Sequence, residues 1–122
     1  MPENKLVDLS FEFARSIVDL VDRIDVPKSS YMIDQLARAG TSVGANIHEA
    51  QYAHSRADFI VKMEIALKEA NETGYWLRLL RETGRISEAD YQSAEQRCGT
   101  IRRLWISSCT TAKANISNRK VQ

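Results

Sequence analysis

The sequence predicts an all-α protein that folds as one antiparallel up-down-up-down four-helix bundle over residues 1–122. Four segments repeat apolar residues at intervals of three and four, which is the spacing of one face of a helix. The chain holds only 5 glycines and 2 prolines, and Pro27 is the one proline away from its start, so long helices can form. No segment alternates apolar and polar residues as a strand does.

The first predicted helix runs from about Asp8 to Asp25. Its apolar stripe consists of Phe13, Ile17, Val21 and Ile24. We expect Pro27 to end it, because the residue before a proline avoids the helical conformation.

The second predicted helix begins at a capping serine, Ser29 or Ser30. Its stripe of apolar or small residues consists of Ile33, Leu36, Gly40, Val43, Ile47 and Ala50. Gly40 and Gly44 each cost about 1 kcal/mol relative to alanine inside a helix. Either the helix breaks at Gly40, or the glycines let a neighbouring backbone come close. The stripe keeps its phase through both glycines, which favours one continuous helix.

The third predicted helix begins at a capping box formed by Ser55 and Asp58 and ends near Glu82. Its seam consists of Phe59, Met63, Ala66, Ala70, Thr73, Leu77 and Leu80. Gly84 then stands where the C-terminal cap of a helix is expected.

The fourth predicted helix begins at a second capping signal, Ser87 with Asp90. Its seam consists of Tyr91, Ala94, Cys98, Ile101, Trp105, Ser108 and Ala112. We expect it to fade near Asn115 into a polar, basic tail that starts at about residue 114. Short connections between all four segments favour antiparallel neighbours.

Three apolar residues of the third helix, Ile65, Trp76 and Leu79, point almost opposite its core seam at about 100° per residue. A single bundle would leave Trp76 partly in water. A row of exposed apolar residues that contains tryptophan is more typical of an interface than of bare surface. These residues therefore predict an oligomer interface in a homo-oligomer.

Four polar residues form a stripe on the second helix, about 125° from its seam. They are Arg38, Ser42, Asn46 and Glu49. One interpretation is a solvated face on which Asp34 and Arg38 form an ordinary ion pair. The other is a hydrogen-bonded contact with a neighbouring helix or subunit. Spacing alone favours the solvated face.

No catalytic, metal or cofactor site is predicted. His48 and His54 are six residues apart, whereas a zinc-binding helix needs histidines four apart. A di-iron bundle needs Glu-x-x-His motifs, and Tyr52 stands three residues after Glu49. The run at residues 40–46 lacks the spacing and the lysine of a phosphate-binding loop.

Two cysteines, Cys98 and Cys109, are 11 residues apart in the predicted fourth helix, about 16 Å along its axis. A disulfide cannot span that distance. We expect two buried, reduced thiols in a cytoplasmic protein. Residues 1–10 lack the apolar core of a signal peptide, and no stretch is apolar enough to span a membrane.

Charge is distributed unevenly along the chain. Residues 96–122 hold six bases and no acids, whereas residues 1–95 carry a net charge of −5. Such asymmetry is typical of an interaction tail, or of a basic helix end that the helix dipole favours. The candidate nucleic-acid-binding residues are Arg78, Arg81, Arg85, Arg97, Arg102 and Arg103. They could contact phosphate near one antiparallel turn, but they share no stripe and no stacking aromatics accompany them.

The segment from Gln35 to Ala50 reads QLARAGTSVGANIHEA. It resembles the signature of the four-helix bundle family encoded in intervening sequences of bacterial 23S ribosomal RNA genes, roughly Q-L-R-R-A-x-x-S-I-x-A-N-I-x-E-G/A. The resemblance continues through residues 58–60, 65–70 and 72–77 and covers about residues 10–108.

This resemblance implies an antiparallel bundle that assembles as a homopentameric ring. It also implies that the polar stripe of the second helix is structural and fixes helix or subunit contacts, because all four residues match the signature. The family is similar to the accessory variability protein of diversity-generating retroelements, which works with a reverse transcriptase and binds nucleic acid on a basic ring surface.

Two functional hypotheses follow. The first is a non-enzymatic oligomeric scaffold or accessory factor that binds RNA or DNA weakly. The second is a protein-binding assembly factor without affinity for nucleic acid. An enzymatic hypothesis rests only on His48 and Glu49, and we predict that the chain is not an enzyme.

Overall fold

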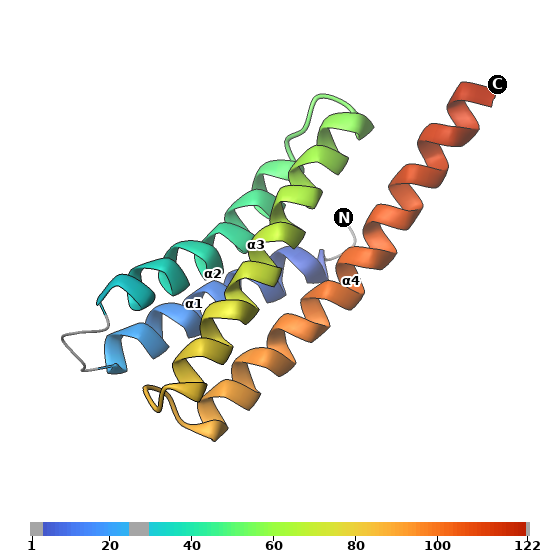
Figure 1. Cartoon of the computed structure of the whole chain (residues 1–122). Helices are drawn as coiled ribbons and strands as arrows, with labels where there is room; N and C mark the ends of the chain where they lie inside the picture. Colours follow the sequence, from blue (N-terminus) through green and yellow to red (C-terminus); the bar gives the residue numbers. More distant parts are fainter. Residues whose placement is uncertain (1–3, 25–29, 122) are drawn as a thin grey trace.

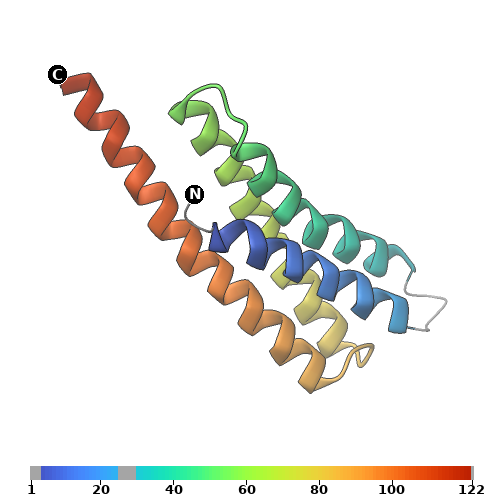
Figure 2. The same cartoon turned by 180° about the vertical axis from the view of Figure 1, so that it is seen from behind.

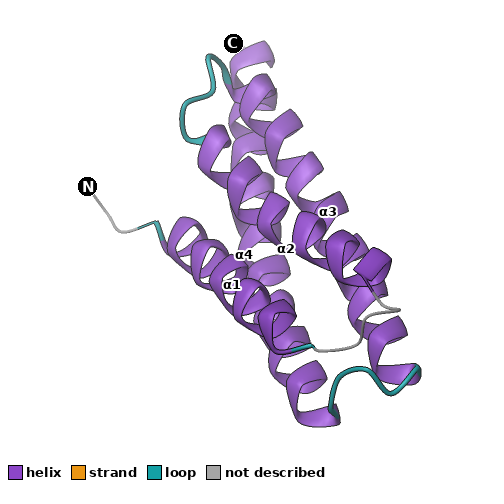
Figure 3. Cartoon of the chain, turned by 90° about the vertical axis from the view of Figure 1, so that its left-hand side faces the viewer, coloured by secondary structure: helices purple, strands orange, loops and turns teal. Residues whose placement is uncertain are grey.

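The computed structural model describes the backbone of residues 4–24 and 30–121 and the side chains of residues 4–24 and 31–110. This part of the chain forms the helices α1 (Lys5–Arg23), α2 (Ser30–Ala50), α3 (Arg56–Glu82) and α4 (Glu88–Val121), with no strand among them (Figure 3). Consecutive helices run antiparallel, and each packs against the two beside it in the ring order α1, α2, α3, α4 (Figure 1). The predicted fold class is confirmed.

Asn4 begins the bundle by capping α1. Its side-chain oxygen accepts a hydrogen bond from the backbone N–H of Val7 at 3.2 Å, so α1 starts three residues earlier than predicted. The helix ends at Ile24, whose backbone is extended. The predicted stop at Pro27 and the predicted cap of the second helix at Ser29 or Ser30 lie outside the described residues and side chains.

The two predicted serine caps that lie within the described side chains are both present. The Ser55 hydroxyl accepts a hydrogen bond from the backbone N–H of Asp58 at 3.0 Å, and the Asp58 carboxylate accepts one from the N–H of His54 at 3.3 Å. The Ser87 hydroxyl likewise accepts from the N–H of Asp90 at 3.0 Å. These contacts satisfy N–H groups that the first turn of a helix leaves without partners, which is why α3 and α4 begin where the sequence predicted.

Gly84 ends the turn that follows α3. Its φ of 73° is left-handed, a conformation that glycine adopts without strain. The N–H of Arg85 then returns to the carbonyl of Leu80 at 2.8 Å, as in a helix-terminating turn.

The predicted seams supply the core between the four helices. Its most deeply buried large side chains include Phe13, Ile17, Leu36, Val43, Ile47, Met63, Leu77, Leu80 and Cys98. Burying one such apolar side chain stabilises the fold by about 1.5–3 kcal/mol. The predicted residues Val21, Ile24, Phe59, Tyr91 and Trp105 pack against the edge of this core and stay partly exposed.

Two glycines bring α2 against α1. A Cβ atom on Gly40 would lie 2.9 Å from the Ile17 side chain, and one on Gly44 would lie 3.0 Å from the backbone oxygen of Ser10. Helix α2 is continuous through both positions. The prediction of one unbroken helix with a close neighbour is therefore confirmed.

Helix α4 is much longer than its partners, with 34 residues against 19 in α1. Its C-terminal turns stand apart from the other helices, and the N-terminal end of α1 lies beside its middle (Figures 1 and 2). The helix does not end near Asn115 as predicted but continues to Val121, because residues 111–121 hold no glycine or proline to break it. No helix in the described part of the chain has the length and apolarity needed to cross a membrane.

Candidate functional site

Arg38 joins α2 to α3 through two carboxylates. Its guanidinium donates hydrogen bonds to Glu69 at 3.0 Å and to Glu72, and its Nε donates to Gln35 at 3.3 Å. The hydrogen bond with Glu72 is the largest cause of a raised pKa for Arg38, and it lowers the pKa of Glu72 in return. Arg38 thus pairs with the next helix instead of with Asp34, since its guanidinium extends across the helix boundary.

The other three residues of the predicted polar stripe lie in different surroundings. The Asn46 side chain donates to the backbone carbonyl of Ser42 at 2.8 Å, so both residues are engaged within α2. Glu49 is exposed near the end of α2, at the edge of a groove described below. The stripe therefore forms no single polar cluster.

Trp76 is covered by two tyrosines of its own chain. It is only 8% exposed, with ring-centroid distances of 5.6 Å to Tyr31 and 5.1 Å to Tyr75 in edge-to-face geometry. The prediction that a single bundle leaves Trp76 partly in water is wrong, because these rings shield it and the side chain is buried. Its buried N–H has no regular hydrogen bond among the described residues, yet it lies close enough to Glu72 to help lower the pKa of that carboxyl.

A second row of side chains runs along the outer face of α3. This α3 ridge consists of Val61, Ile65, Lys68, Glu72, Tyr75 and Leu79, spaced alternately four and three residues apart. Val61 is 53% exposed, Ile65 is 38% exposed and Tyr75 is 61% exposed. Such spacing is the pattern of a helix that packs against another helix. Of the predicted interface residues, Ile65 and Leu79 lie on this ridge.

Sequence reasoning missed Val61 and Tyr75, although the same spacing identifies them. Tyr75, and not the neighbouring Trp76, occupies the outer position between Ile65 and Leu79. Extending the four-and-three repeat in both directions from Ile65 would have found the whole row.

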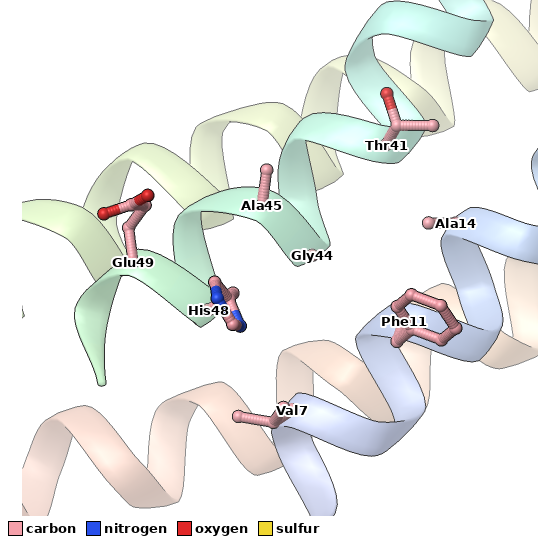
Figure 4. A pocket seen from close by; sticks show the side chains of 8 residues that line it. All are labelled: Val7, Phe11, Ala14, Thr41, Gly44, Ala45, His48 and Glu49. Carbon is pink, nitrogen blue, oxygen red and sulfur yellow. The ribbon is translucent and has the colours of Figure 1, made fainter. Parts of the chain in front are cut away.

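The second feature of the surface is a groove of about 450 Å³ between α1 and α2 (Figure 4). This α1–α2 groove is lined by Val7, Phe11, Ala14, Thr41, Gly44, Ala45, His48 and Glu49. Phe11 is 67% exposed. His48 lies beside Val7 at one end, and Thr41 lies beside Ala14 at the other (Figure 4). The sequence did not reveal this groove, because it depends on how two helices pack.

The residues that line the groove suit the binding of an apolar partner better than catalysis. The Thr41 hydroxyl already donates to the carbonyl of Ala37 at 2.7 Å. The His48 ring contacts Tyr52, with centroids 5.3 Å apart, and Glu49 is exposed. Nucleophilic catalysis needs a nucleophile within hydrogen-bond reach of a base. Among the lining residues, the Thr41 hydroxyl donates to a backbone carbonyl and not to His48 or Glu49.

Arg81 is held within its own chain. Its guanidinium bonds Glu82 at 2.8 Å, approaches Glu88 at 3.8 Å and stacks 3.9 Å from the centroid of the Tyr91 ring. The hydrogen bond that Arg81 donates to Glu82 is the largest cause of the raised pKa of Arg81. An arginine with these partners is less available to phosphate than a solvated one.

The remaining candidate basic residues differ in their partners and in their exposure. Arg102 pairs with Glu95 at 3.6 Å, Arg103 donates to the Thr100 hydroxyl at 3.0 Å and Arg85 donates to the Thr83 carbonyl at 3.3 Å. Arg78 and Arg97 are exposed. Arg97 lines a polar hollow between α1 and α4, next to the ion pair of Arg23 and Asp90. Four of the six candidate arginines are therefore engaged by partners within the chain: Arg81, Arg85, Arg102 and Arg103.

The described residues form no metal-binding site, and their two cysteines are poorly placed for nucleophilic reactions. No group of three or more histidines, cysteines or acids there could hold a metal ion. Cys98 and Cys109 are both buried, and neither forms a disulfide, as predicted. The Cys98 thiol lies 3.6 Å from the carbonyl of Ala70, and burial raises its pKa to about 11. A thiol with this pKa is a poor nucleophile near neutral pH.

Comparison with known proteins gives a matching family and solved structures that resemble this chain. The model of a family described as 23S rRNA-intervening sequence protein matches residues 2–107. A protein of unknown function from Bacteroides thetaiotaomicron, described as a member of the S23 ribosomal protein family, is 48% identical to this chain. Its crystal structure superposes with a TM-score of 0.81 and covers 85% of this chain and 97% of its own. No curated protein matches the chain.

Proposed function

The chain belongs to the 23S rRNA-intervening sequence protein family, and we propose that it is a non-catalytic, self-associating scaffold or accessory factor. The family resemblance suggests a closed ring of five copies. Two buried cysteines that form no disulfide fit a reducing compartment, so the cytoplasm is the proposed location.

The observation that carries this proposal is the pair of apolar surfaces on different helices, the α3 ridge and the α1–α2 groove. Phe11, Val61 and Tyr75 are each more than half exposed. Contiguous exposed apolar side chains on a protein surface mark interaction sites more often than bare surface. Ile65 and Leu79 take part directly in the proposed interface, and Trp76 supports it from below through Tyr75.

A catalytic function has less support. The groove contributes only exposed polar groups at its edge, His48 and Glu49, above an apolar floor. An active site usually holds its reacting side chains in place with hydrogen bonds from supporting residues. A binding surface has no such requirement, and the apolar lining of the groove fits it.

Light scattering on the purified full chain over a dilution series tests self-association. We expect a mass that is a multiple of 13.8 kDa, with a plateau at five chains if the ring has five copies. A plateau at another multiple would keep self-association and reject the pentamer. A mass of 13.8 kDa at every concentration would reject the proposed function.

Nucleic-acid binding is a second candidate, favoured by the charge and position of the end of α4. Residues 96–122 carry six bases and no acids, and the last turns of this helix stand apart from the other helices (Figure 1). Lysine and arginine side chains bind the phosphate backbone irrespective of its sequence. Among the predicted arginines, Arg97 and Arg103 are the exposed ones on α4. If nucleic acid does not bind, a protein-binding assembly factor is the remaining hypothesis.

A further inference from the structure

We propose that the α3 ridge of one copy packs into the α1–α2 groove of a second copy of this chain. This inference rests on the self-association proposed above and adds which surfaces meet. Each chain then contributes its ridge to one neighbour and its groove to another, because the ridge and the groove are formed by different helices.

Unlike surfaces give a head-to-tail interface. Two copies related by a two-fold axis would bury the same patch on each, whereas a ridge in a groove leaves one ridge and one groove free on every pair. Repetition of the same contact then closes a ring or extends a filament. Self-association through these surfaces therefore continues past a dimer.

The outer face of α1 has the same spacing as the ridge. Val7, Phe11, Ala14 and Val18 follow one another at intervals of four, three and four residues. Both Phe11 and Val18 are exposed, at 67% and 43%. Two helices pack closely when each offers such a repeat to the other, because the side chains of one fill the gaps between those of its partner.

Contacts inside one chain show which residues lie at the same level, meaning the same height along the long axis of the bundle. Gly44 of α2 faces the backbone of Ser10 in α1. Val43 of α2 borders the same small hollow in the core as Ala66 of α3. The residues next to these in sequence, Ala45, Phe11 and Ile65, therefore share one level on the outer surface.

A rotation about an axis parallel to the helices keeps every residue at its own level. The Ile65 of one copy then meets Phe11 and Ala45 of the next, which places apolar side chains against each other. Within one chain α1 and α3 run in the same direction, since both are antiparallel to α2 (Figure 1). The rotation keeps these directions, so the incoming α3 runs parallel to α1 of its neighbour.

The two surfaces carry complementary charge. Glu49 is the one carboxylate among the lining residues of the groove. The ridge holds Lys68 and Glu72, but Glu72 is already paired with Arg38 of its own chain. The ridge therefore presents the exposed ammonium of Lys68 to a groove that bears a single negative charge.

The direction of these side chains brings the two charges together. A helical side chain leans toward the N-terminus of its own helix. Lys68 leans toward the level of Ile65, and Glu49 leans toward the level of Ala45, which is the same level. We infer that Lys68 of one copy and Glu49 of the next form an ion pair at the edge of the apolar contact.

The first experiment disables each surface separately in the full chain. Phe11→Glu puts a charge in the groove, and Ile65→Glu puts one on the ridge. Ile106→Glu is the matched control, because Ile106 is an apolar residue of α4 with 57% exposure outside both surfaces. By light scattering we expect the first two variants to have the mass of one chain and the control to keep the mass of the unmodified protein. Circular dichroism verifies that all three remain helical.

Mixing the two single-chain variants tests the head-to-tail geometry. Phe11→Glu retains an intact ridge, and Ile65→Glu retains an intact groove, so an equimolar mixture has one working interface. We expect a complex of two chains in the mixture and of one chain in each variant alone. A mixture that stays at the mass of one chain would overturn the proposal.

Exchange of the charges tests the ion pair. Glu49→Lys and Lys68→Glu alone each place like charges together, and we expect either to raise the dissociation constant by about tenfold or more. The double variant restores opposite charges and should recover assembly. If both single variants assemble like the unmodified protein, or if the double variant is no better than either, the pairing of these residues is refuted.

The two proposals fail in different ways. If the unmodified chain is a monomer, self-association itself is rejected, and the assignment of surfaces falls with it. If it assembles but Phe11→Glu and Ile65→Glu assemble equally well, self-association stands and the ridge-in-groove contact is overturned. Loss of assembly in Ile106→Glu alone would likewise overturn it and move the interface to α4.

Discussion

Arg38 of α2 and Glu72 of α3 pair across the boundary between two helices, and each stabilises the charged form of the other. Glu69 accepts a second hydrogen bond from the same guanidinium. Arg38 is thus the residue of the family signature whose role as a helix-to-helix contact is visible within one chain.

Replacing Glu72 by glutamine should lower the thermal stability in a way that depends on pH. The lowered pKa of Glu72 means that the unfolded chain binds this proton more readily than the folded one. Its contribution is therefore present above the ordinary carboxyl pKa of about 4.3 and is lost as the pH falls through the lowered value. Melting curves followed by circular dichroism should show a gap between the two proteins at neutral pH that closes below about pH 4.

Glu12→Gln is the control for this measurement. Glu12 and Arg15 lie 3.9 Å apart, with more than half of each side chain exposed, so their pair contributes little. A melting-temperature gap for Glu72→Gln that stays constant down to acidic pH would contradict the proposed linkage.

Alanine at Gly44 should destabilise the bundle, and alanine at Gly74 should not. A methyl group at Gly44 would lie 3.0 Å from the backbone oxygen of Ser10, which cannot move without displacing α1. We expect a loss of about 1–3 kcal/mol in the free energy of unfolding, as for other overpacked sites. At Gly74 the methyl meets only the flexible end of Glu95 at 3.2 Å, so the better helix propensity should give a gain of up to about 1 kcal/mol. Urea titrations measure both values, and an equal gain at both positions would refute the close approach of α1 and α2.

Both thiols should be unreactive in the folded protein. With a pKa of about 11, the Cys98 thiol is only about 0.1% thiolate at pH 8. Cys109 is also buried. A chromogenic disulfide reagent should titrate 2 thiols per chain in denaturant and essentially none in native buffer. Rapid reaction of one thiol in the native state would show that the packing of α4 around that cysteine opens locally.

Binding of fluorescent RNA and DNA across a salt series tests the second functional candidate. Phosphate contacts predict affinity that falls steeply with salt, with a slope that counts the contacts. Alanine at Arg97 and Arg103 together should weaken binding and reduce the slope, whereas Arg15→Ala on α1 should leave both unchanged. No binding even near about 50 mM salt would favour the protein-binding assembly factor.

The sequence predicted the features that local chemistry determines. Ser55 and Ser87 mark helix starts because a serine side chain satisfies N–H groups within its own first turn. The seams followed from helical periodicity, which depends only on residue spacing. Gly84 could be assigned because a left-handed residue is needed to end a helix in that way.

Features that depend on packing between helices could not be predicted in the same way. Nothing in the spacing of α2 shows that Arg38 pairs with α3 and not with Asp34, because the position of α3 is set by the core. Trp76 looked exposed on a helical wheel, yet Tyr31 approaches it from another helix. The α1–α2 groove exists only once Gly44 has brought the two helices together.

Intermolecular cross-linking at the proposed interface tests the central claim most directly. A chain carrying both Ala45→Cys and Ile65→Cys places one new thiol in the groove and one on the ridge, and a disulfide forms only if their Cα atoms come within about 7 Å. Mild oxidation followed by alkylation and non-reducing electrophoresis should give a ladder of two, three and more linked chains, while each single variant gives none. A band of one chain from the double variant, or dimers formed equally by either single variant, would contradict the packing of the α3 ridge into the α1–α2 groove.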